Sequence, residues 1–304
     1  MNHEGDHLAV ERAPSKRQER RSQEVWADNL AEEMARMVDV AENFLYVALD
    51  TQFGGLVLQP KGPFTSLSEY HWQTLKANVD LTKVLQVSFT FSDPRGIRPK
   101  GICTWRFNFS FNSSRDFYSK EVVESLCQQR NLSIRRHMEE GIQPNQFAEL
   151  LLGSGLVLNE DVHWITYRGT NTLEVREDGH PGRPEAPHIV LAGLYDLAHL
   201  LQMLRGECIP DEVQNFFEDL DLFFPCRCDI SKHLSRQNGS SFRNAHYILD
   251  AFFRLPDAVR RTAFEPENEA VTVLSVPDAS EPPPGFARAT GKSSRKEREE
   301  SRQK

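Results

Sequence analysis

The chain has 304 residues, of which 39% are apolar, 26% charged and 10% aromatic, and its formal net charge is −8. This composition excludes a collagen-like, mucin-like or wholly disordered chain, and the length predicts one large domain or two small ones with a real core. No apolar run approaches the ~18 residues needed to cross a bilayer, no apolar signal segment begins the chain, and five cysteines predict reduced thiols in a cytosolic or nuclear protein.

The pattern predicts a disordered N-terminal arm over residues 1–23, a folded domain over 24–276 that diverges after residue 255, and a disordered charged tail over 277–304. Apolar residues at three- and four-residue spacing predict these helices: Glu24–Asn43, Ser68–Val79, Lys120–Arg130, Gln143–Ser154, Leu194–Leu204 and Ser241–Leu255. Strand-like runs occur at Phe44–Asp50, Val84–Phe91, Thr104–Asn112, His163–Tyr167 and at the start of Arg227–Leu234.

The segment Thr104–Asn112 alternates strictly between aromatic and polar side chains. This period of two predicts a half-buried antiparallel strand whose aromatic face lies in the core, in preference to a surface for stacking bases. Together with the other strand-like runs it indicates an α/β mixed sheet.

The first candidate site is Asp50-Thr51-Gln52-Phe53, at the end of the first predicted strand. Side chains two residues apart on a strand point the same way, so Asp50 and Gln52 could together hold a hard cation such as Mg²⁺. The alternative is a strand-end acid that enters a turn.

The second candidate is Asp196, near the start of the helix predicted over Leu194–Leu204. The alternative for this carboxylate is an acid in the first helical turn, which the helix dipole favours.

Seven segments, in order, resemble the Caf-type (Pop-type) catalytic subunit of the Ccr–Not deadenylase complex. They are EVWADNLAEEMARM (24–37), VALDTQF (47–53), ANVDLTKVLQVSFTF (77–91), TWRFNFSFN (104–112), FAELLLGSGLVLNEDVHWIT (147–166), LYDLAHLLQML (194–204) and LFFPCRCDISKHL (222–234).

This resemblance implies an RNase H-like mixed sheet flanked by helices and a DEDD-type 3′-exoribonuclease that removes poly(A) tails. In that class four acids bind two Mg²⁺ or Mn²⁺ ions, which activate water and stabilise the leaving oxygen. The implied partners are poly(A) RNA, the Ccr–Not scaffold and Ccr-type nuclease subunits, with no membrane, and the implied location is cytoplasm and nucleus. Because residues 24–284 carry a net charge of −13, the ions and not a basic surface would accommodate the phosphate.

Residue by residue, Asp50 matches the family's first acid, and Asp196, after Tyr195, matches the third. Gln52 stands where the family has the second acid, a Glu. An amide oxygen can coordinate a cation but brings no full charge to offset the repulsion between two ions.

The fourth acid of the family lies in a His-Gln-Ala-Gly-Ser-Asp stretch that this chain lacks. One alignment places that position near Glu265, Glu267 or Glu269, and a rival alignment places it at Asn244. Neither alignment supplies the His, the expected general base, whose loss typically costs ~10²–10⁴-fold. Two functions therefore remain open: a poly(A)-specific 3′-exoribonuclease, and a catalytically impaired family member that acts as a non-enzymatic binding subunit.

A loop of about 25 residues at 169–193 interrupts the resemblance, and a loop of this length is uncommon inside a compact domain. It is either a genuine surface insertion beside the site or an error in the derived sequence, such as a translated intron.

Overall fold

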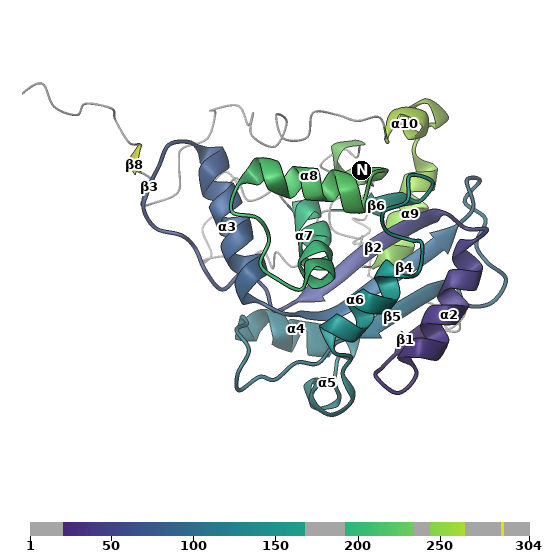
Figure 1. The fold of residues 1–304 in the computed structure, drawn as a ribbon, viewed down its shortest axis with the longest axis horizontal. Helices are drawn as coiled ribbons and strands as arrows, with labels where there is room; N and C mark the ends of the chain where they lie inside the picture. The colour runs from purple at the N-terminus through teal and green to yellow at the C-terminus, as the bar shows by residue number, and fades with distance from the viewer. Residues whose placement is uncertain (1–20, 168–191, 234–243, 265–286, 289–304) are drawn as a thin grey trace, which may run out of the picture.

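The computed structural model describes residues 21–167, 192–233, 244–264 and 287–288. A six-stranded mixed sheet with the strand order β1-β5-β4-β2-β6-β7 runs through the molecule, with helices on both faces (Figure 1). Its strands are β1 (Ser22–Val25), β2 (Tyr46–Phe53), β4 (Val84–Ser92), β5 (Thr104–Asn108), β6 (His163–Thr166) and β7 (Arg227–Asp229). A separate pair joins β3 (Pro63–Phe64) to β8 (Ala287–Arg288). The expected α/β mixed sheet is confirmed.

The sheet combines both strand directions around the central strand β2. Strand β4 is antiparallel to β2 and β5, whereas β1 is parallel to β5, β6 to β2, and β7 to β6. Every residue of β2 after Tyr46 is buried, since the strand has a neighbour on each side and helices on each face.

The helices are α2 (Leu30–Ala41), α3 (Leu67–Leu81), α4 (Lys120–Arg130), α5 (Ile134–Glu140), α6 (Pro144–Leu152), α7 (Ala192–Arg205), α8 (Val213–Phe223), α9 (Ala245–Arg254) and α10 (Asp257–Thr262), with a 3-10 helix at Ile230–His233. Side-chain caps begin several of them: Ser66, Ser119, Ser133 and Asn244 each accept a hydrogen bond from a backbone N–H of the first turn. No helix within the described ranges is long and apolar enough to cross a membrane.

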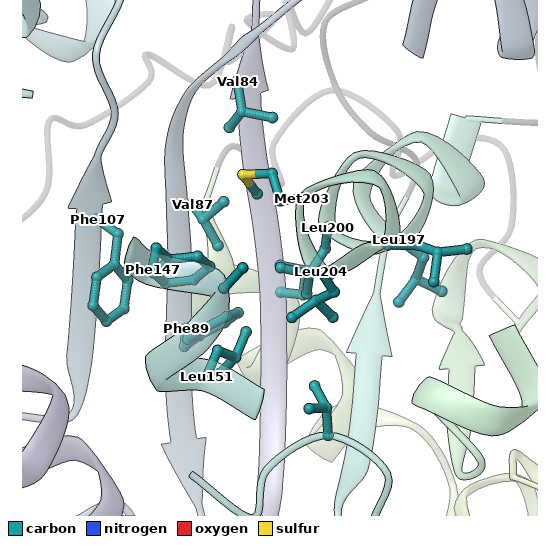
Figure 2. Close-up of a cluster of buried hydrophobic side chains, with 14 of the residues drawn as sticks. Val84, Val87, Phe89, Phe107, Phe147, Leu151, Leu197, Leu200, Met203 and Leu204 are labelled. Atoms are coloured by element: carbon teal, nitrogen blue, oxygen red, sulfur yellow. The ribbon is translucent and has the colours of Figure 1, made fainter. Parts of the chain in front are cut away.

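The larger core lies between the sheet and helices α2, α6, α7 and α8. Phe89 and Phe107 of the sheet face Phe147 of α6, while Leu200 and Leu204 of α7 lie beside them (Figure 2). A smaller core on the other face packs α9 against Ala48, Ile165 and Cys228. Because side chains alternate along β2, Val47 and Leu49 enter the first core and Ala48 the second.

The N-terminal prediction is wrong in its boundaries. The helix expected over Glu24–Asn43 begins only at Leu30, and Ser22–Val25 form a strand that pairs in parallel with β5. The Asn29 side chain accepts a hydrogen bond from the Trp26 N–H at 2.7 Å and stabilises the turn between strand and helix. Ser22 and Gln23 of the expected arm therefore belong to the sheet, whereas residues 1–20 lie outside the described part.

The aromatic segment is buried as predicted, although β5 is shorter than expected and ends at Asn108. Its four large side chains are at most 1% exposed: Trp105, Phe107, Phe109 and Phe111. The expected inserted loop lies almost wholly outside the described residues, as does the expected tail except for Ala287–Arg288 of β8.

Candidate active site

Asp50 lies in the middle of the sheet, opposite Ser88 of β4, and is only 2% exposed. Gln52 Nε2 donates a hydrogen bond to Asp50 Oδ2 at 2.9 Å, which confirms that the two side chains lie on one face of β2. The guanidinium of Arg130, the last residue of α4, approaches the same oxygen at 3.6 Å.

Burial raises the pKa of Asp50 above its usual value, because the charged carboxylate loses water. The positive charge of Arg130 and the hydrogen bond from Gln52 oppose this rise. The positive charges of Arg130 and, more weakly, Arg106 thus act with the amide of Gln52 to offset the burial of this carboxylate.

Asp196 is fully buried and reaches β2 from helix α7. Its Oδ1 accepts hydrogen bonds from the Thr51 backbone N–H at 3.0 Å and from the Thr51 hydroxyl at 2.5 Å. The first-turn alternative is wrong, because α7 begins at Ala192 and Asp196 lies beyond its first turn. Asp196 thus contacts Thr51, the residue that follows Asp50, although Asp50 and Asp196 are 146 positions apart in the sequence.

The carboxylate of Asp196 is repelled by the other carboxylates near it. Burial first, and then the nearby charge of Asp50, raise the pKa of Asp196 well above its usual value, while the bonds from Thr51 oppose the rise. The carboxylate of Asp229 adds to the repulsion. Asp229 ends β7, where its Oδ1 accepts from the Ser231 N–H at 2.8 Å.

The residues present suit one divalent cation. Asp196 Oδ2 is buried and has no hydrogen-bond partner among the described residues, so it is an acceptor that a cation would satisfy. Carboxylate oxygens and the Gln52 amide oxygen are the hard donors that Mg²⁺ and Mn²⁺ take. Within the described ranges no group of three or more His, Cys, Asp or Glu side chains is arranged to hold a metal ion.

Asn244, one of the two options for the fourth acid position, caps α9 by accepting from the Tyr247 N–H at 3.3 Å. The far end of α9 contacts the start of β2, where Phe252 and Phe253 lie 6.1 and 5.8 Å from the Tyr46 ring. Helix α9 packs in the second core with Ala48, which lies on the same face of β2 as Asp50, so Asn244 begins a helix that covers this face. The other option, Glu265, Glu267 or Glu269, lies outside the described residues.

Two residues of the site, Asp229 and Arg130, were not predicted from the sequence, and Thr51 was named in the first candidate motif without its role as a donor to Asp196. Asp229 had a weak signal, since it ends a short strand of the mixed sheet. Nothing in the sequence indicates Arg130, because its approach to Asp50 depends on how α4 packs against the sheet.

No protein-family profile matches the chain, but whole-sequence comparison finds relatives. Poly(A) ribonuclease pop2 of Schizosaccharomyces pombe is 39% identical over 207 residues, which are 68% of this chain and 54% of that protein. Probable CCR4-associated factor 1 homolog 7 of Arabidopsis thaliana is 38% identical over 219 residues, or 70% of each chain. Homolog 10 of the same plant is 36% identical over 216 residues, or 69% of each chain.

This chain belongs to the CCR4-associated factor 1 (Pop2) family. The match spans about half of the S. pombe relative but more than two thirds of both plant relatives.

Solved structures agree with this family membership. The Mg²⁺- and Mn²⁺-bound form of S. pombe Pop2p has a TM-score of 0.65 and 32% identity, covering 80% of this chain and 94% of that one. The fold is also shared with the RNase domain of yeast Pop2, at a TM-score of 0.58 and 24% identity over 79% and 86% of the chains. A third neighbour is a yeast NOT1 MIF4G domain co-crystallised with CAF1, at a TM-score of 0.56 and 24% identity over 77% and 87%.

Proposed function

We propose that this chain is a 3′-exoribonuclease that depends on a divalent cation, shortens poly(A), and serves as a deadenylase subunit of a Ccr–Not complex. The observation that carries the proposal is the meeting of Asp50 and Asp196 at Thr51. These two positions match the first and third acids of the family motif, and two separate elements bring them together. The named relative in S. pombe is a poly(A) ribonuclease.

Asp50, Asp196 and the Gln52 amide oxygen would hold Mg²⁺ or Mn²⁺. A cation bound there would supply an activated water and would stabilise charge on the phosphate and leaving oxygens. Thr51 fixes the Asp196 carboxylate with two donors, and Gln52 fixes that of Asp50 with one. Burial of all these side chains keeps bulk water away from the cation's ligands.

The site carries less negative charge than the family motif. Gln52 replaces an acid, and we propose that Asn244 stands at the fourth acid position, because α9 covers the face of β2 on which Asp50 lies. Each replacement removes one unit of negative charge, so the affinity for a second cation falls first. We expect a slow nuclease that needs a high cation concentration.

The proposed partners are poly(A) RNA, a NOT1-type scaffold, as in the yeast CAF1 complex, and a Ccr-type nuclease subunit. Cytoplasm and nucleus are the proposed location, because polyadenylated RNA occurs in both. The comparisons do not favour the alternative of a non-enzymatic subunit, since the S. pombe relative is named as a ribonuclease.

The test is shortening of a 5′-labelled oligo(A) by purified protein in Mn²⁺, with Asp196→Asn and Gln52→Glu beside the parent chain. We expect stepwise shortening by the parent, a loss of at least about 100-fold in Asp196→Asn, and faster shortening by Gln52→Glu at low Mn²⁺. Gln214→Glu on α8 adds the same charge far from the site and should match the parent. No shortening by the parent or by Gln52→Glu would contradict the enzymatic function and support the non-enzymatic one.

A further inference from the structure

Arg130, the last residue of α4, places its guanidinium beside the carboxylate of Asp50. Asn131 terminates the helix in the left-handed conformation, with φ of 54°, which Asn tolerates better than most residues. The preceding Arg130 side chain is only 18% exposed, so it lies largely inside the protein.

One hydrogen-bond donor and one cationic group already approach a single oxygen of Asp50. Gln52 Nε2 bonds Oδ2 at 2.9 Å, and Arg130 Nη1 lies 3.6 Å from the same atom. A cation that used Oδ2 would have to displace one of these groups, and a cation on Oδ1 would lie near a fixed positive charge. Arg cannot release its proton in the physiological range, so this opposition does not vanish with pH.

We propose that Arg130 is a built-in counterion of Asp50 that competes with the divalent cation for this carboxylate. The inference rests on the proposed cation site. Arg130 neutralises a buried charge that a second cation would otherwise balance, and it keeps the cation-free site folded. The cost is a weaker affinity for the cation.

This role also explains how Gln52 is accommodated. With an acid at position 52, Arg130 would face two neighbouring carboxylates. With Gln52, the amide donates a hydrogen bond to Asp50 Oδ2 and the guanidinium balances its charge without any metal. Gln52 and Arg130 therefore both stabilise the site in the absence of its cation.

The test measures Mn²⁺ affinity directly, without RNA, by titration calorimetry and by the electron paramagnetic resonance signal of free Mn²⁺. Arg130→Gln should bind Mn²⁺ about tenfold more tightly than the parent chain. Arg130→Lys retains the charge and should bind as the parent does. Arg130→Met removes the charge but retains an apolar stem, and it replaces Arg130→Gln if that variant does not fold. In cation-free buffer both neutral variants should melt at a lower temperature than the parent, because Asp50 loses its counterion.

Arg36→Gln is the matched control, since Arg36 pairs with the exposed Glu32 and the buried Glu33 of α2 and not with the site's carboxylates. It should leave Mn²⁺ affinity unchanged. Equal or weaker Mn²⁺ binding by both neutral variants, while Asp196→Asn still abolishes binding, would overturn the counterion role and leave the cation site intact. Absence of Mn²⁺ binding in the parent and in the neutral variants alike would overturn the proposed site and the inference together.

Discussion

At the scale of single residues, a polar side chain buried beside β2 has no hydrogen-bond partner within the described ranges. His199 on α7 is fully buried, and neither ring nitrogen has a hydrogen-bond partner in the described part of the chain. Its ring lies 4.4 Å from that of Phe53 on β2. Burial lowers the pKa of His199 to about 3, so the folded protein holds a neutral ring.

Because the His199 ring is neutral in the folded protein, we expect its contribution to the unfolding free energy to fall as the pH falls. Unfolded His199 takes up a proton below about pH 6.5, whereas the folded ring does not until about pH 3, so its contribution to stability is present above 6.5 and lost as the pH falls. Between pH 7 and pH 5 the parent should lose up to about 2 kcal/mol more unfolding free energy than His199→Phe. Urea unfolding at both pH values measures the difference. An identical loss in the two proteins would show that His199 is not buried as a neutral ring.

At the scale of elements, helix α9 depends on a side chain from the loop between β4 and β5. Arg98 Nη2 donates to the His246 carbonyl at 3.0 Å and to Asp250 Oδ1 at 2.5 Å. Both acceptors belong to α9, which carries Asn244 at its start and covers the second core. Arg98 thereby holds in place the helix that covers one face of the site's strand.

Removing this attachment should loosen α9 before the rest of the fold. Arg98→Ala should cost about 1.5–3 kcal/mol in unfolding free energy, the usual size for hydrogen bonds to charged groups. Amide hydrogen exchange in α9 should quicken more than in α7. Arg95→Ala is the control from the same loop: it removes the exposed Arg95 side chain from its pair with Asp93 and should cost at most about 1 kcal/mol. Equal costs for the two variants would contradict the special role of Arg98.

Elements with a strong local signal were predicted well. Helix α4 begins and ends where the apolar spacing predicts, and β2 and β4 lie within a few residues of their predicted ranges. Strand β1 was mistaken for part of a helix because Val25 and Trp26 continue the apolar spacing of α2. Only pairing with β5, about 80 residues later, decides its conformation.

At the scale of the whole molecule, the candidate site exists only because the fold joins distant segments. The motif residues Asp50, Gln52 and Asp196 could be selected from the sequence by resemblance, but the donation from Thr51 to Asp196 and the approach of Arg130 could not. The first needs α7 packed against β2, and the second needs α4 to end beside it. The strand order is equally non-local, with β4 between β2 and β5 and β1 at the edge.

The central claim is that Asp50 and Asp196 jointly hold a catalytic divalent cation. Crystals of the protein soaked in MnCl₂ and measured at a wavelength that excites manganese locate the ion by its anomalous signal. We predict a peak bonded to an oxygen of Asp50 and to Asp196 Oδ2, the buried atom that has no other partner among the described residues. Manganese bound only elsewhere, with Asp196 Oδ2 still without a ligand, would contradict the account.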